Sequence, residues 1–186
     1  LKIILMGDVC TGKSSLITRF IDDIFDSIVA STSTIEINKQ TKLIEIDKKQ
    51  LNIEIYDTSG DLECCEHQRN AVRLYKYLNG VIFVYSITDL YSFDNLKLWL
   101  NQLIIHSGNK DIPKLIIGNK IDSEDKRRQV TYEKGLKFAE ENDSLFMEAS
   151  AITGQNVFES FEMFIKKIIQ VEKLTNKKNK IQCRCM

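Results

Sequence analysis

Short apolar runs alternate with helical patterns along most of this 186-residue chain, and this order limits the folds that it can adopt. Strand-like runs lie near residues 1–6, 35–46, 50–56, 80–86, 113–118 and 144–148. Helical patterns lie near residues 13–25, 66–78, 91–106, 131–142 and 155–173. Because parallel strands need a long crossover, the alternation predicts an α/β fold with a six-stranded, mostly parallel sheet and helices on both faces. Only the second and third runs are joined closely, through Asp47 to Lys49, which predicts one antiparallel hairpin.

The length of the chain limits the number of domains, and its net charge limits the kinds of partner that we expect. The chain suits one core, so we predict a domain over residues 1–173 and a flexible basic tail over 174–186. Its 26 basic and 26 acidic residues give no net charge, and we therefore expect no nucleic-acid partner. The apolar runs are shorter than a membrane-spanning helix. No signal peptide precedes the first strand, and the missing initiating methionine suggests a truncated N-terminus.

A glycine-containing loop follows the first strand and opens the first helix. The segment Gly7 to Ser14 fits the pattern G-x-x-x-x-G-K-[ST], whose backbone N–H groups bind phosphate oxygens. Lys13 would reach the β- and γ-phosphates, and the Ser14 hydroxyl would ligate Mg²⁺. The predicted nucleotide-binding residues here are Asp8, Val9, Cys10, Thr11, Gly12, Lys13, Ser14 and Ser15. A chance glycine turn is the alternative, and this loop alone does not distinguish ATP from GTP.

A second loop, Asn119-Lys120-Ile121-Asp122, follows the fifth strand. The Asp122 carboxylate can accept hydrogen bonds from guanine N1–H and its exocyclic amine, a pair that adenine does not offer. Asn119 would hold the loop and the base, and the stem of Lys120 would lie along the ring. An ordinary solvated turn is the alternative, but the position at a strand end favours guanine binding and disfavours an ATPase or kinase.

The order of these motifs resembles a known family. The phosphate loop, a Thr-rich segment, Asp57-Thr58-Ser59-Gly60, the Asn119 loop and Glu148-Ala149-Ser150-Ala151 follow one another as in Ras-superfamily small GTPases, over residues 1–173. The chain is most similar to the Rab group. That similarity rests on Gly7-Asp8, Lys13 to Leu16, Arg19-Phe20, Tyr85 to Asp89, Ser92-Phe93, Asn95 to Leu100 with Trp99, and the C-terminal cysteines. It implies a P-loop GTPase fold and a GTP/GDP switch in vesicle trafficking.

The resemblance also implies roles for single residues. Phe25 matches the aromatic residue that packs on guanine, with an ordinary core Phe in the first helix as the alternative. Ser150 and Ala151 match the loop that contacts guanine O6, although Ile152 replaces the usual Lys. The implied metal ligands are Ser14, Thr34 and Asp57, and the implied catalytic residues are Lys13, Thr34, Gly60 and Asp61.

The switch threonine can be placed in two ways. Counting back from Asp57 gives Thr34, whereas counting forward from Lys13 gives Thr32. We favour Thr34, because Ile35 and Ile37 then enter the second strand in register.

Two substitutions bear on hydrolysis. Asp61 stands where the family has a Gln that orients the attacking water, and Val9 stands where a small residue is usual. A carboxylate near the γ-phosphate adds repulsion and lacks the amide donor. We therefore expect weak intrinsic GTP hydrolysis, with a hydrolysis-deficient GTP-binding scaffold as the alternative.

The last residues are Cys183-Arg184-Cys185-Met186, after a lysine-rich stretch. This ending resembles a double prenylation site, with an unmodified tail as the alternative. It implies lipid anchoring at Cys183 and Cys185, location on the cytoplasmic face of intracellular membranes, and a cytosolic pool. The family also implies effectors, an exchange factor, a GTPase-activating protein and a prenyl-carrier chaperone.

Overall fold

The computed structural model describes residues 1–26, 37–46, 48–58, 60, 74–109, 111–123 and 127–182, with side chains through Leu174. Its strands are β1 (Lys2–Met6), β2 (Asn38–Ile46), β3 (Lys49–Asp57), β4 (Gly80–Ser86), β5 (Lys114–Asn119) and β6 (Leu145–Ala149). Its helices are α1 (Lys13–Asp22), α4 (Leu90–Asp94), α5 (Leu96–Ser107), α6 (Tyr132–Glu141) and α7 (Val157–Gln182).

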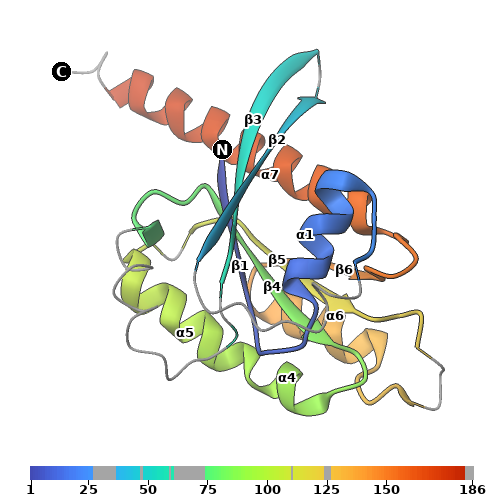
Figure 1. The fold of residues 1–186 in the computed structure, drawn as a ribbon. Coiled ribbons are helices and arrows are strands. Elements are labelled where there is room, and N and C mark those ends of the chain that lie inside the picture. The colour runs from blue at the N-terminus through green and yellow to red at the C-terminus, as the bar shows by residue number, and fades with distance from the viewer. Residues whose placement is uncertain are drawn as a thin grey trace.

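The strands form one six-stranded sheet in the order β2-β3-β1-β4-β5-β6 (Figure 1). Strand β2 pairs antiparallel with β3, from Asn38 opposite Asp57 to Ile46 opposite Lys49. The other pairs are parallel. The predicted fold class and the predicted hairpin are therefore confirmed.

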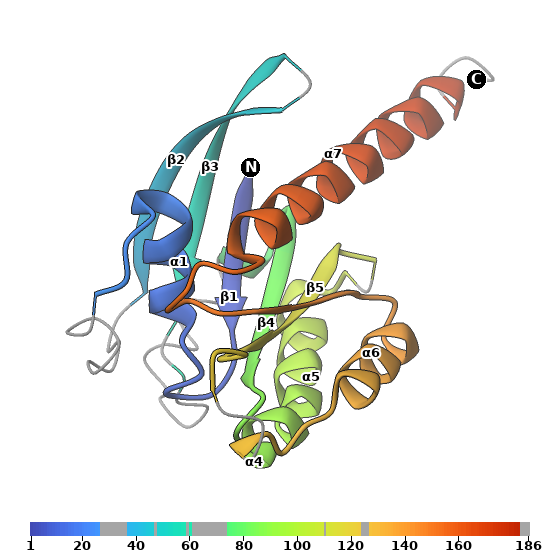
Figure 2. The same ribbon diagram turned by 90° about the vertical axis from the view of Figure 1, so that its right-hand side faces the viewer.

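Helices cover both faces of the sheet (Figure 2). One hydrophobic core joins α1 and α7 to Ile3 and Leu5 of β1. The other core joins α5 and α6 to the alternate residues Ile4 and Met6. Both sides of the strand are buried, which explains its continuous apolar sequence. In sheets of this kind, ligands bind beyond the carboxyl ends of the parallel strands, which the helices leave uncovered.

Helix α1 ends at Asp22, earlier than the predicted end at residue 25. Asp23 adopts a left-handed conformation, with φ of 56°, and its N–H donates to the Arg19 carbonyl. The Lys42 ammonium, from β2, donates to the carbonyls of Phe20 and Ile21 and so caps the helix end. The helix is therefore ended partly by a residue on a distant strand, which periodicity does not reveal.

The single helix predicted over 91–106 is divided at Asn95 into α4 and α5. The Asp89 carboxylate begins α4 by accepting from the N–H groups of Tyr91 and Ser92. The Asn95 carbonyl then accepts from Leu98 and Trp99 and starts α5.

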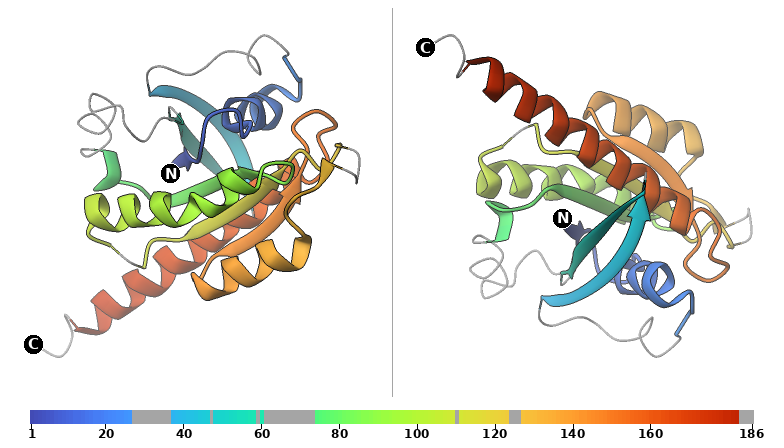
Figure 3. Two further views of the ribbon diagram at one scale, coloured as in Figure 1. Left: turned by 90° about the horizontal axis from the view of Figure 1, so that it is seen from below. Right: turned by 90° about the horizontal axis from the view of Figure 1, so that it is seen from above.

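The last helix, α7, continues to Gln182, so the boundary predicted at residue 173 falls inside a helix. Its final turns extend away from the sheet (Figure 3). Near that exit, the Asn79 amide donates to Glu172 at 2.7 Å and its oxygen accepts from the Lys2 N–H at 2.7 Å. Among the described residues, no helix is long and apolar enough to cross a membrane. The end of the domain stays a prediction.

Candidate nucleotide-binding site

The loops that follow β1, β5 and β6 meet at one end of the sheet, and Asn119 joins them. Its side chain is fully buried. The amide donates to the Thr11 carbonyl at 2.8 Å, and its oxygen accepts from the Ala151 N–H at 3.2 Å. Three segments that are far apart in the sequence are thus held together by one amide.

Lys13 lies buried beneath the phosphate loop. Its ammonium donates to the carbonyls of Gly7 and Asp8, each at 2.9 Å. Burial lowers the pKa of Lys13 to about 8, against the opposing effect of the Asp57 and Asp8 carboxylates. The fold therefore holds a cation away from water, where an incoming phosphate would gain more from it than in water.

Two glycines allow the loops to approach closely. Gly12 caps α1 with φ of 94°, and a Cβ there would lie 2.2 Å from the Asn119 amide nitrogen. A Cβ on Gly60 would lie 2.2 Å from the Val9 nitrogen and 2.4 Å from the Asp8 carbonyl carbon. The segment after β3 therefore packs against the phosphate loop only because residue 60 has no side chain.

The side-chain oxygens of Ser14 and Asp57 lie next to each other at the predicted Mg²⁺ site. The Ser14 hydroxyl donates to Asp57 at 2.5 Å, and Asp57 is buried at the end of β3. Thr58, the next residue, donates its hydroxyl to the Leu5 carbonyl at 2.6 Å and fixes this corner to β1. Such oxygen donors fit Mg²⁺, which would neutralise phosphate charge when bound. Ser14 and Asp57 are the side chains that would hold it.

The predicted base-recognition residues also come together. The Ser150 hydroxyl donates to Asp122 at 2.5 Å. The Lys120 ammonium donates to the Cys10 carbonyl at 2.6 Å, so the Lys120 side chain reaches from the loop after β5 to the phosphate loop. These contacts orient a carboxylate at the place where the sequence predicted guanine recognition.

Arg19 secures the loop after β6, a role that the sequence did not reveal. Its guanidinium donates to the carbonyls of Ala151 at 2.9 Å and Ile152 at 2.6 Å. Backbone carbonyls receive these bonds, so the unusual Ile152 side chain does not prevent them. Arg19 had stood out only as part of a Rab-like pair.

An ion pair between Arg128 and Glu148 is a further contact that the sequence did not reveal. Arg128 binds Glu148 through two hydrogen bonds, at 2.7 and 2.9 Å, and donates to the Val130 carbonyl at 3.0 Å. It ties the segment after β5 to β6, just before Ser150. Bidentate pairs fix geometry as well as charge, so this one supports both base-recognition loops.

Some of the other residues predicted for the site lie in the described part of the structure, and others do not. Phe25 lies beyond the end of α1 and packs partly on the core beside α1 and α7. Val9 and Cys10 are exposed, and Cys10 has φ of 61°. The predicted residues outside the described part are Thr32, Thr34, Asp61, Cys183 and Cys185, together with most of the predicted helix 66–78.

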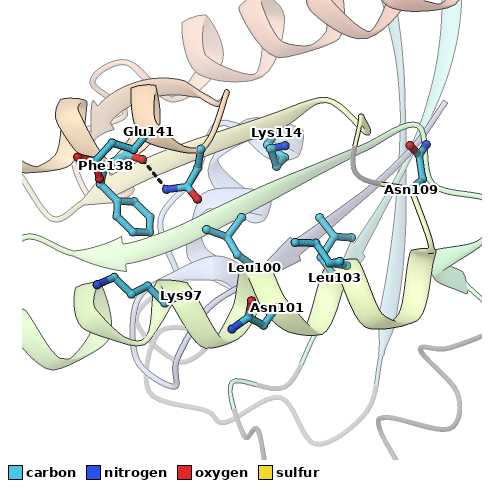
Figure 4. A pocket seen from close by; sticks show the side chains of 10 residues that line it. Lys97, Leu100, Asn101, Leu103, Asn109, Lys114, Phe138 and Glu141 are labelled. Atoms are coloured by element: carbon cyan, nitrogen blue, oxygen red, sulfur yellow. Dashed lines mark hydrogen bonds between the residues drawn. The ribbon is translucent and has the colours of Figure 1, made fainter.

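A separate groove lies between α5 and α6 (Figure 4). Lys97, Leu100 and Asn101 line it from α5, and Phe138 and Glu141 line it from α6. None of the predicted nucleotide-binding residues lines this groove.

The sequence is similar to those of known proteins. The model of the Ras family matches residues 2–170. Ras-related protein Rab-18-B of Danio rerio is 40% identical over 171 residues, which cover 91% of this chain and 80% of that protein. Ras-related protein Rab-18 of Lymnaea stagnalis is 40% identical over 96% of this chain and 86% of its own length. Ras-related protein RABC1 of Arabidopsis thaliana is 36% identical over 94% of this chain and 79% of its own length.

The matched residues include the phosphate loop, Asp57, the Asn119 loop and Ser150. The order of the strands, the contacts between the loops and the sequence identity over most of the chain therefore all point to the same family. The chain belongs to the Ras family and is a Rab-like small GTPase.

Proposed function

We propose that this protein is a Mg²⁺-dependent GTP/GDP switch that regulates vesicle trafficking. The observation that carries the proposal is the bonding of Asn119 to both the phosphate loop and the Ala151 loop. Lys13 binds the phosphates, Asp122 accepts from the guanine, and the N–H of Gly60 contacts the γ-phosphate. GTP then draws Thr34 and Gly60 inward, and the ordered surface recruits effectors.

The family suggests the rest of the cycle. An exchange factor replaces GDP, a GTPase-activating protein speeds hydrolysis, and a prenyl-carrier chaperone moves the protein between the cytosol and membranes. The support is the similarity to proteins named Rab-18, which cover most of this chain. Effectors read the conformation of the switch segments, so the state of the nucleotide controls which partners bind.

We further propose that intrinsic hydrolysis is slow. Val9 is 43% exposed at the phosphate loop, and its backbone lies against Gly60. Its branched side chain therefore occupies space next to the residue that contacts the γ-phosphate. The following residue, Asp61, carries a negative charge in place of the water-orienting Gln.

Single-turnover GTP hydrolysis tests this proposal. Asp61→Gln is expected to raise the rate by about tenfold or more, since an orienting amide replaces a repelling carboxylate. Val9→Gly should raise it further, and Asp111→Asn, on a distant exposed loop, serves as the control. A wild-type rate as fast as that of ordinary relatives, which Asp61→Gln leaves unchanged, contradicts the idea of slow intrinsic hydrolysis.

The same two residues favour a second function, a GTP-binding scaffold without useful hydrolysis. The two functions differ in their response to a GTPase-activating protein. A switch shows about a thousandfold acceleration or more, in the range that an arginine supplied in trans provides. A scaffold retains bound GTP with the activating protein present.

For the membrane we propose prenylation of Cys183 and Cys185. Two lipid chains hold a protein on a bilayer stably, whereas one binds only marginally. Mass spectrometry of the protein from its native cells should find two isoprenoid groups, and Cys183→Ser with Cys185→Ser should shift the protein to the cytosolic fraction. Unmodified cysteines in membrane-bound protein contradict this proposal.

A further inference from the structure

The Asp8 carboxylate of the phosphate loop is held by two side chains from the α4–α5 region. The Trp99 indole N–H donates to Oδ1 at 2.7 Å, and the Asn95 amide donates to Oδ2 at 2.7 Å. Trp99 is only 5% exposed. Both oxygens of one charged group are thus bound by donors 87 and 91 residues away in the chain. Hydrogen bonds to a charged group are among the stronger ones in proteins.

The backbone of the same residue supports the phosphate-binding groups. The Asp8 carbonyl accepts from the Lys13 ammonium and from the Thr11 hydroxyl, each at 2.9 Å. On its other side, the Asp8–Val9 peptide packs against Gly60. A shift of Asp8 would therefore move the phosphate-binding cation and disturb the contact of Gly60 with the loop.

We propose that Trp99 and Asn95 are positioning residues for nucleotide binding. They act through Asp8, whose fixed carboxylate sets the peptide that orients Lys13 and receives Gly60. This inference rests on the GTPase function proposed above and adds two residues that do not touch the nucleotide. It also gives a physical reason why two features quoted as Rab-like, Gly7-Asp8 and the run from Asn95 with Trp99, occur together: they bind each other.

A merely structural role makes a different prediction. If the two donors only attach α5 to the sheet, their loss lowers thermal stability equally with and without nucleotide and leaves nucleotide release unchanged. If they position the loop, nucleotide release becomes faster. The discriminating measurement is therefore the dissociation rate of a fluorescent GDP analogue in Mg²⁺, recorded beside melting temperatures.

Trp99→Phe removes the N–H and keeps an aromatic ring. We expect GDP release to become about tenfold faster, the factor that corresponds to one lost hydrogen bond to a charged group. The matched control is Gln102→Ala, which removes a hydrogen bond of 2.8 Å to His106 on the same helix without touching Asp8. Its release rate should equal that of the wild type.

Exchanging the Asp and Asn side chains of positions 8 and 95 should restore slow nucleotide release. Asn95→Asp places a second carboxylate against Asp8 and should speed release by more than tenfold, because like charges at this distance repel. Adding Asp8→Asn should return the rate to within about threefold of the wild type, since an amide can donate to the new carboxylate and still accept from Trp99. Failure of this second substitution to rescue contradicts the positioning role.

The chain contains a single Trp, so its emission reports this contact directly. Removal of Mg²⁺ and GDP with a chelator should shift the emission of the wild type, and Asp8→Ala should abolish the shift. Release rates of Trp99→Phe and Asn95→Asp equal to that of the wild type overturn the inference. A wild type that retains no GDP at all instead overturns the proposed function, so the two failures are distinguishable.

Discussion

Asp122→Asn is expected to lower the affinity for GTP by about a thousandfold and to create affinity for xanthosine triphosphate. In the proposed function, the carboxylate accepts from both the N1–H and the exocyclic amine of guanine. The N–H of the new Asn amide faces the guanine amine, and both groups are donors. Xanthine carries a carbonyl at the position of that amine, and the Asn amide can donate to it. Sites built on such pairing reject an unmatched partner by factors of this size or larger.

Competition against a fluorescent GDP analogue measures both affinities. Asp111→Asn makes the same chemical change on an exposed loop and should alter neither of them. Since Ser150 also donates to Asp122 at 2.5 Å, melting temperatures should accompany the binding data. Equal GTP affinity for wild type and Asp122→Asn contradicts guanine recognition by this loop.

Lys13→Met should lower the affinity for GTP by about a thousandfold, because it removes the buried cation and keeps a side chain of similar length. The ammonium donates to Gly7 and Asp8 and is only 6% exposed. An ion-pair hydrogen bond to phosphate in such a setting is worth several kcal/mol. Calorimetric titration with GTP and Mg²⁺ measures the loss. Lys137→Met, with a 78% exposed side chain, is the control.

The same substitution should not unfold the nucleotide-free protein. Burial lowers the pKa of Lys13 from 10.5 to about 8, so folding disfavours the charged ammonium relative to the unfolded chain. The charged form therefore costs folding free energy below pH 8, and this cost is lifted as the pH rises from about 8 to 10.5. Met carries no such cost. A nucleotide-free variant that melts well below the wild type contradicts this account.

The motifs that we propose to bind the nucleotide could be located in the sequence because each is a local pattern with a local physical cause. A phosphate loop needs glycine, lysine and hydroxyl residues at fixed spacing between a strand and a helix, and Gly12, Lys13 and Ser14 provide them. Asn119 and Asp122 likewise follow a buried strand. The fold class was predictable for the same reason, since periodicity reports which face of each segment is buried.

Boundaries were harder to predict, because distant residues set them. Helix α1 ends where Lys42 of β2 binds its last carbonyls, so Phe25 lies beyond it. The break before α5 falls at Asn95, whose amide is bound to Asp8. Neither contact has a sequence signal, since the partners are far apart in the chain.

The sequence by itself determined the fold class and the residues that we propose to bind a guanine nucleotide. Only the tertiary structure decided what holds those residues in place. Arg19 binds the Ala151 loop, Arg128 binds Glu148, and Trp99 binds Asp8. A motif is specified by neighbours along the chain, whereas its supports are specified by the packing of helices on the sheet.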